Sequence, residues 1–229
     1  MPGATKLLGV ALCLALSAQT GSWRQSFPTD GLDLRTVGEN TFFMLKPGYQ
    51  LTLRESGKTP TTLLVTVLNE TKNVGGIEAR VVEERESKGA ELVEVSRNYF
   101  AIDDKTKDVY YLGEDVDMYK NGKITSHEGS WHHGTAGARL GLFVPGKPAV
   151  GLRFYQEQAP GVAMDRVEIV SLIDTLTTPA GTFKGCLKIR ESSPLEPLVR
   201  DYKTFAPGIG LIKDGDAVLV SFRNSDGIR

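Results

Sequence analysis

Apolar and polar residues alternate along much of the chain with a period of two, which is typical of β-strands that are buried on one face. Tyr49, Leu51 and Leu53, for example, are separated by single polar residues. Other segments with strand-like patterns lie at 61–68, 77–81, 93–99, 109–112, 152–156, 167–176, 187–191, 201–205 and 217–222. The pattern therefore predicts a protein built mainly from strands.

Turn signals separate these segments and indicate antiparallel connections. Pro-Gly pairs, which are typical of type II turns with a positive φ at the glycine, occur at positions 47–48, 145–146, 160–161 and 207–208. Pairs typical of tight hairpins occur at 75–76, 121–122 and 214–215. A short helix is plausible only in 33–45. We expect an all-β, mainly antiparallel fold, as a strongly bent sheet, half-barrel or sandwich with few or no long helices.

Residues 1–22 have the composition of an export signal. A short segment with one basic residue, Lys6, precedes an apolar run at 7–16 and a small, polar stretch at 17–22. The apolar run has ten residues, whereas a membrane-spanning helix needs about 20. We therefore expect cleavage, no membrane span afterwards, and a periplasmic or extracellular location.

The remaining segment, 23–229, is predicted to form a single β-rich domain, with a subdivision near 129–151 as the alternative. Cys186 is the one cysteine of this segment, so no intramolecular disulfide can form and the core must hold the fold. Its formal charge is 26 − 28 = −2, which gives no field that would attract nucleic acid.

The chain contains no motif that identifies a reaction or a cofactor. It lacks a phosphate-binding loop and a nucleophile elbow, so we expect no cofactor and a protein that is not an enzyme. The acidic run at 83–86 is predicted to be a solvated strand end, because a run of carboxylates does not by itself place two acids in one cleft.

The Gly-rich segment 129–151 is the least regular part of the chain and contains two of the three histidines. His127, His132 and His133 lie near several carboxylates, and this combination of nitrogen and oxygen ligands is one that metals accept. Adjacent residues on an extended strand point in opposite directions, so both His132 and His133 can bind one ion only if the loop bends. The alternative is a structured loop with Trp131 packed on the sheet.

Two segments resemble paired motifs of an uncharacterised family of exported bacterial β-rich proteins. They are Thr-Pro-Ala-Gly-Thr-Phe with Cys-Leu-Lys-Ile at 178–189, and Tyr-Lys-Thr-Phe-Ala-Pro-Gly-Ile-Gly-Leu-Ile-Lys at 202–213. The segment 109–123 is also similar to members of that family. The resemblance implies export and a β-rich fold but no activity. The layout also resembles, at fold level, the open half-barrels of lipoprotein carriers of the bacterial envelope.

Three functions remain open from the sequence. The first is a non-catalytic exported protein that binds an apolar or amphipathic, lipid-like ligand or a partner segment on a concave sheet face, which predicts an apolar cavity of roughly several hundred Å³. The second is a structural or interaction protein of the cell envelope, which predicts an exposed apolar patch. The third is a metal-binding protein that uses the three histidines.

Overall fold

The computed structural model describes residues 22–224 and 227–228, and this part of the chain contains strands and no helix. Most of the predicted leader, residues 1–21, lies outside the described residues. Within them, no helix has the length and hydropathy needed to cross a membrane. The strands are β1 (Leu34–Arg35), β2 (Gly38–Asn40), β3 (Phe43–Leu45), β4 (Gln50–Arg54), β5 (Thr61–Val74), β6 (Ile77–Lys88), β7 (Glu91–Asp103), β8 (Val109–Lys120), β9 (Lys123–Ser126), β10 (Trp131–His132), β11 (Arg139–Val144), β12 (Arg153–Tyr155), β13 (Glu157–Gln158), β14 (Arg166–Thr178), β15 (Gly181–Ser192), β16 (Asp201–Ala206), β17 (Gly210–Asp214), β18 (Ala217–Asn224) and β19 (Gly227–Ile228).

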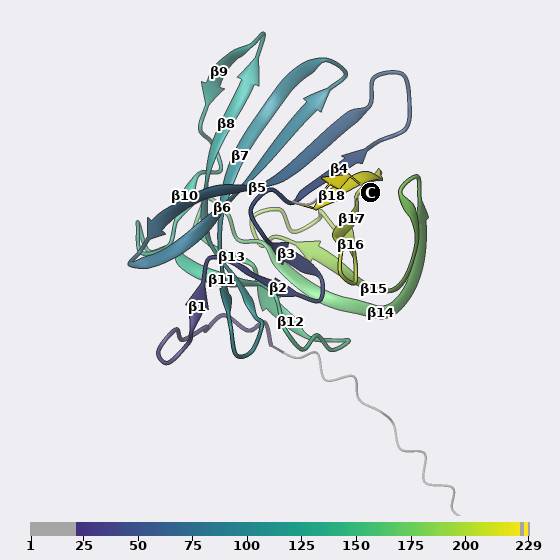
Figure 1. Cartoon of the computed structure of the whole chain (residues 1–229). Helices are drawn as coiled ribbons and strands as arrows, with labels where there is room; N and C mark the ends of the chain where they lie inside the picture. Colours follow the sequence, from purple (N-terminus) through teal and green to yellow (C-terminus); the bar gives the residue numbers. More distant parts are fainter. Residues whose placement is uncertain (1–21, 225–226, 229) are drawn as a thin grey trace, which may run out of the picture.

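The strands form an antiparallel sheet that is nearly closed into a barrel. The hydrogen-bonded ladders give the order β13, β11, β8, β7, β6, β5, β4, β18, β17, β16, β15, β14, β12. Figure 1 shows the long strands β5–β8 in blue and teal on one side and β14–β18 in green and yellow on the other. The prediction of an all-β, strongly bent antiparallel sheet is confirmed.

The barrel has one seam, and the chain itself crosses it. β12 and β13 lie at opposite ends of the strand order but are separated in sequence by Gln156 alone. The side-chain amide of Gln156 donates to the carbonyl of Phe143 at 2.9 Å, and that of Gln158 donates to the carbonyl of Leu140 at 2.7 Å. Side-chain hydrogen bonds therefore fasten the crossing segment to β11.

The segment that follows the predicted cleavage position pairs with the free edge of β12. The backbone of Arg24 donates to the carbonyl of Arg153 and accepts from the N–H of Tyr155, each at 3.0 Å. The ring of Trp23 lies under the guanidinium of Arg166, at 4.5 Å from the ring centre. The edge of β12 at the seam is thus paired rather than left exposed.

The helix considered plausible at 33–45 is wrong, because this segment forms β1 and the β2–β3 hairpin. The amide oxygen of Asn40 accepts from the backbone N–H of Phe42 at 2.8 Å. Such a local side-chain bond stabilises a turn at the expense of helix. Leu45, at the end of β3, is fully buried, so tertiary packing reinforces the hairpin.

The β2–β3 hairpin covers one end of the barrel. The amide nitrogen of Asn40 donates to the carbonyls of Lys107 at 2.8 Å and Pro145 at 3.1 Å, which lie at the ends of β8 and β11. On the other side, the backbone N–H of Gly208, in the β16–β17 turn, donates to the carbonyl of Thr41 at 2.8 Å. The hairpin is therefore bound to strands on both sides of the barrel.

The predicted turns are formed with one exception. Gly208 has a φ of +72°, as a type II turn at Pro207-Gly208 requires. Gly146 is not among the residues with positive φ, so the same prediction is wrong at Pro145-Gly146. A β-carbon on Gly146 would overlap the carbonyl oxygen of Thr106, and this close approach of two backbones explains a glycine there.

The segment 129–151 is more regular than its sequence indicates. It contributes β10 and β11, which both pair with β8. Trp131 is buried and packs edge-on against Tyr111, with ring centres 5.4 Å apart. The predicted packing of Trp131 on the sheet is therefore seen, but Trp131 lies in strand β10 and not in a loop.

Candidate functional site in the barrel interior

The alternation along β6 directs polar groups into the barrel. Glu84 lies opposite Ser96 of β7 and Val65 of β5, and residues opposite each other in neighbouring strands share one face of the sheet. Val82, two residues earlier, is buried on the same face. Glu84 therefore points inward, so the prediction that 83–86 is a solvated strand end is wrong for Glu84, which lines an interior cavity, although the run does lie near the end of β6.

A cavity of about 180 Å³ lies in the interior, and its lining is acidic. Seven carboxylates, each from a different strand or strand end, line it with one cation, Lys203. The carboxylates are Glu84, Glu94, Glu114, Glu157, Asp165, Glu191 and Asp214. The remaining wall is made of aromatic rings and of the amide and hydroxyl side chains of β7 and the seam.

Lys203 neutralises only part of this charge. Its ammonium lies 3.1 Å from a carboxylate oxygen of Glu191 and 3.8 Å from one of Asp214. Burial lowers the pKa of Lys203, but attraction by Glu191, Asp214 and Glu84 outweighs burial and leaves the pKa above its usual range. Lys203 therefore stays protonated and forms ion pairs with two of the seven carboxylates, those of Glu191 and Asp214.

Glu84 and Glu157 have no hydrogen-bond or ion-pair partner for their side chains among the described residues. Burial raises the pKa of Glu84 to about 7, and Lys203 opposes this shift only in part. Burial, together with the charges of Glu114 and Asp165, raises the pKa of Glu157 well above its usual range. For both side chains burial outweighs the attraction of Lys203, so compensation by the protein is incomplete.

Four further acids of the cavity show the same direction. Burial raises the pKa of Glu114 to about 8, the charge of Glu84 adds to the effect, and the nearby hydroxyl of Tyr111 opposes it. Burial also raises the pKa of Glu94, Asp165 and Asp214. At neutral pH the cavity therefore retains protons that exposed carboxylates would release.

An aromatic wall borders the carboxylates on the side of the β2–β3 hairpin. The rings of Phe100 and Tyr111 are stacked, with centres 4.7 Å apart, and Phe143 lies 4.8 Å from Phe100. The hydroxyl of Tyr111 donates to the amide oxygen of Asn98 at 2.5 Å. Phe43, from the hairpin, lies 5.0 Å from Phe100. The interior thus changes from aromatic at the covered end to acidic farther along β7.

A second, smaller cavity of about 40 Å³ adjoins the first and is mainly apolar. Leu51, Val65 and Phe205 contribute to its wall, and Glu84 and Phe143 line both cavities. The larger interior cavity is acidic, not apolar, so the expectation of an apolar cavity of several hundred Å³ is not met. The interior provides a small apolar space next to a charged one.

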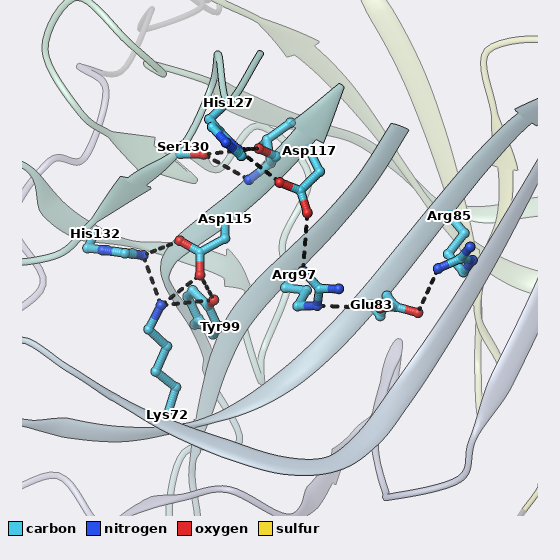
Figure 2. Close-up of polar contacts among 11 residues, drawn as sticks. Lys72, Glu83, Arg85, Arg97, Tyr99, Asp115, Asp117, His127, Ser130 and His132 are labelled. Carbon is cyan, nitrogen blue, oxygen red and sulfur yellow. Dashed lines mark hydrogen bonds and ion pairs between the residues drawn. The ribbon is translucent and has the colours of Figure 1, made fainter. Parts of the chain in front are cut away.

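The three histidines lie outside this site, and Figure 2 shows two of them among polar contacts made by residues of β5 to β10. Nδ1 of His127 lies 2.9 Å from a carboxylate oxygen of Asp117, and Nε2 of His132 lies 2.9 Å from one of Asp115. The two histidines therefore contact different acids, and the structure does not join them in one ligand set.

His133 points elsewhere, as expected for adjacent residues on a strand. Its Nδ1 accepts a hydrogen bond from the backbone N–H of Leu140 at 3.1 Å. In the part of the chain that the structure describes, no three His, Cys, Asp or Glu side chains are grouped closely enough to hold a metal ion. Metal binding by these histidines stays a prediction without a geometric site.

The contacts in Figure 2 include an ion pair between strands that are not neighbours in the sheet, Lys72 of β5 and Asp115 of β8. The ammonium of Lys72 lies 2.7 Å from Asp115 and 3.1 Å from the hydroxyl of Tyr99, and Tyr99 donates to Asp115. Burial acts to raise the pKa of Asp115, but Lys72 and Tyr99 outweigh it and leave the pKa below its usual range. These acids are compensated, unlike Glu84 and Glu157.

Comparison of the chain with protein-family models, curated proteins and solved structures finds no match. The predicted resemblance to exported β-rich proteins and to envelope half-barrels therefore has no support from these comparisons, and the site must be interpreted from its own chemistry.

Proposed function

We propose that this protein is an exported, non-catalytic binding module that holds a small amphipathic molecule inside its barrel. The observation that carries the proposal is the pair of adjoining interior cavities, which share Glu84 and Phe143. One is apolar and the other is lined by seven carboxylates and one lysine. Concave sites that combine an apolar wall with a few polar groups are typical of small-molecule binding.

The charged lining supports binding more than a purely structural interior. Partial burial of a carboxylate destabilises a folded protein unless a cation compensates it, and burial raises the pKa of both Glu84 and Glu157. A ligand that compensates them gives these residues a role. Export is supported by the sequence of residues 1–22 alone.

Binding by the purified protein tests the proposal. A neutral fluorescent probe such as N-phenyl-1-naphthylamine should bind saturably, and Val65→Phe, which fills the apolar cavity, should weaken binding by about tenfold. Val199→Phe is the matched control, because Val199 is exposed outside the barrel. Absence of saturable binding by this probe and by small amphiphiles would refute the proposal.

Exposed apolar side chains favour the envelope-interaction protein as a second candidate. Leu198, in the loop between β15 and β16, is 95% exposed and Ile173 on β14 is 86% exposed. Leu195 and Val199 of the same loop are also exposed. Apolar residues on a loop are a feature of protein contact sites, and loss of a co-purifying partner after Leu198→Ser would support this candidate.

A further inference from the structure

We propose that the molecule held in the barrel carries a cationic amine, with its ammonium among Glu84, Glu114 and Glu157 and its apolar part against Phe143 and the apolar cavity. This inference rests on the proposed function and specifies the chemical class of the ligand.

The first argument is the charge of the lining. The larger cavity has seven carboxylates and one lysine, and the ion pairs of Lys203 involve Glu191 and Asp214. The carboxylates on the opposite wall, contributed by β6, β8 and β13, have no cation within ion-pair distance among the described residues. An anionic ligand would meet this wall with like charge, whereas a cation would compensate it.

The second argument is the state of two individual side chains. Glu84 and Glu157 face the cavity, are partly buried, and have no ion-pair partner among the described residues. Carboxylates that are partly withdrawn from water gain from a cation brought to them. An ammonium supplies three N–H donors and a positive charge, which is what two unpaired carboxylates lack.

The third argument is the aromatic wall beside them. Phe100, Tyr111 and Phe143 line the same cavity as the carboxylates. Aromatic faces attract organic cations, and the effect is stronger where water is excluded. Carboxylates together with aromatic rings form a lining suited to an alkylammonium or arylalkylammonium group.

A metal ion does not fit these observations equally well. No three carboxylate or histidine side chains among residues 22–224 are close enough to coordinate one ion. The carboxylates are spread around a cavity of about 180 Å³. Such spacing leaves room for an organic cation, whose N–H groups reach separate acceptors.

The continuity of the two cavities sets the shape of the ligand. Glu84 and Phe143 line both, so a molecule with its ammonium at Glu84 can direct a carbon chain toward Leu51 and Val65. The small volume of the apolar cavity, about 40 Å³, excludes a long acyl chain. A short alkylamine is therefore a suitable probe.

Calorimetric titration of the purified protein with hexylamine, hexan-1-ol and hexanoate at about pH 8 tests the inference, because the three probes share a chain and differ in head-group charge. Hexylamine should bind at least about tenfold more tightly than the other two. If the alcohol or the acid binds as tightly as the amine, the cationic class is refuted and the binding function stands. If none of these probes nor N-phenyl-1-naphthylamine binds, both proposals are refuted.

Variants locate the amine within the barrel. Glu84→Gln and Glu157→Gln should each weaken hexylamine binding by about tenfold and leave binding of hexan-1-ol within about twofold. Glu70→Gln is the matched control. Glu70 is exposed on β5, so this substitution removes the same charge from the outer surface. Equal weakening by Glu70→Gln would indicate long-range charge and refute the site.

Proton release gives an independent readout. Since the acids of the cavity retain protons at neutral pH, a bound ammonium should displace them, so that the binding enthalpy depends on the ionisation enthalpy of the buffer. Binding of hexylamine that releases no protons at about pH 7 would contradict placement of the ammonium among these carboxylates.

Discussion

A β-carbon on Gly141 would overlap the carbonyl oxygen of Gln156, because the chain that crosses the seam passes directly over β11. Gly141 does not have a positive φ, so its requirement for glycine comes from this close approach and not from backbone strain. The contact determines where Glu157, the next residue, enters the barrel. The seam and the acidic cavity are thus parts of one arrangement.

Gly141→Ala should lower the free energy of unfolding by more than about 2 kcal/mol, since the backbone of the crossing segment must move away. Gly137→Ala is the control, because Gly137 has a φ of +80° and open space around it, and it should cost about 1 kcal/mol. Urea unfolding measures both. Equal costs would contradict the close approach.

The stability of the ligand-free protein should fall as the pH rises from about 4.5 to about 8. The pKa values of Glu84 and Glu114 are raised to about 7 and about 8 in the folded state, so the folded protein binds protons that the unfolded chain releases. Lys203 is the cation that faces these acids among the described lining residues. The contribution of these two acids to the free energy of unfolding is therefore fully present below about pH 4.5 and is lost as the pH rises to about 8.

The double substitution of Glu84 and Glu114 by Gln should reduce this pH dependence. At about pH 8.5 the variant should exceed the wild type in free energy of unfolding, on the order of 2 kcal/mol, and at about pH 5 the difference should be small. Urea unfolding at several pH values measures this, with Glu70→Gln as the control. Wild-type stability that rises between about pH 5 and 8 would rule out desolvated acids in the barrel.

Trp23→Ala should lower the free energy of unfolding by about 1 kcal/mol. The substitution removes the indole ring, whose centre lies 4.5 Å from the guanidinium carbon of Arg166 and 6.3 Å from the ring centre of Tyr155. Thermal unfolding measures the loss. Leu198→Ala, at a side chain that is 95% exposed, should have no measurable effect, and an equal effect of the two would argue against closure of the β12 edge by residues 23 and 24.

Tyr99→Phe should lower the free energy of unfolding by about 1–2 kcal/mol. The Tyr99 side chain is buried, and the substitution removes its hydroxyl, which donates a hydrogen bond to Asp115. Lys72→Met should cost less than about 1 kcal/mol, since Lys72 and Asp115 are 38% and 42% exposed and their attraction is screened. Urea unfolding of both variants at low and high salt distinguishes the cost of the lost hydrogen bond from the cost of the lost ion pair. A larger cost for Lys72→Met would contradict this order.

Much of the fold could be predicted from local patterns. Alternation at 49–53 places Leu51 and Leu53 inside, and both are buried in the structure. The pair at Asn121-Gly122 forms the β8–β9 hairpin, with positive φ at both residues. Such signals succeed because the side-chain period and the turn geometry are properties of neighbouring residues.

The candidate site could not be predicted in the same way. Its carboxylates come from positions 84 to 214 and from separate strands, so no spacing in the sequence relates them. One pattern in the run at 83–86 does indicate the site. Glu84 follows the apolar Val82 by two residues, so in a strand that continues past residue 81 the two side chains lie on the same, inward face. The three histidines, although close in sequence, have separate partners because strand geometry turns them apart.

The amino-acid sequence by itself determined the all-β class and the positions of the main strands and hairpins, because these depend on local composition and periodicity. Only the tertiary structure decided that the sheet nearly closes, that the seam is crossed at Gln156, and that unpaired carboxylates meet inside. Closure depends on long-range strand pairing, and the desolvation of an acid depends on every wall around it, so neither is a property of any short stretch of chain.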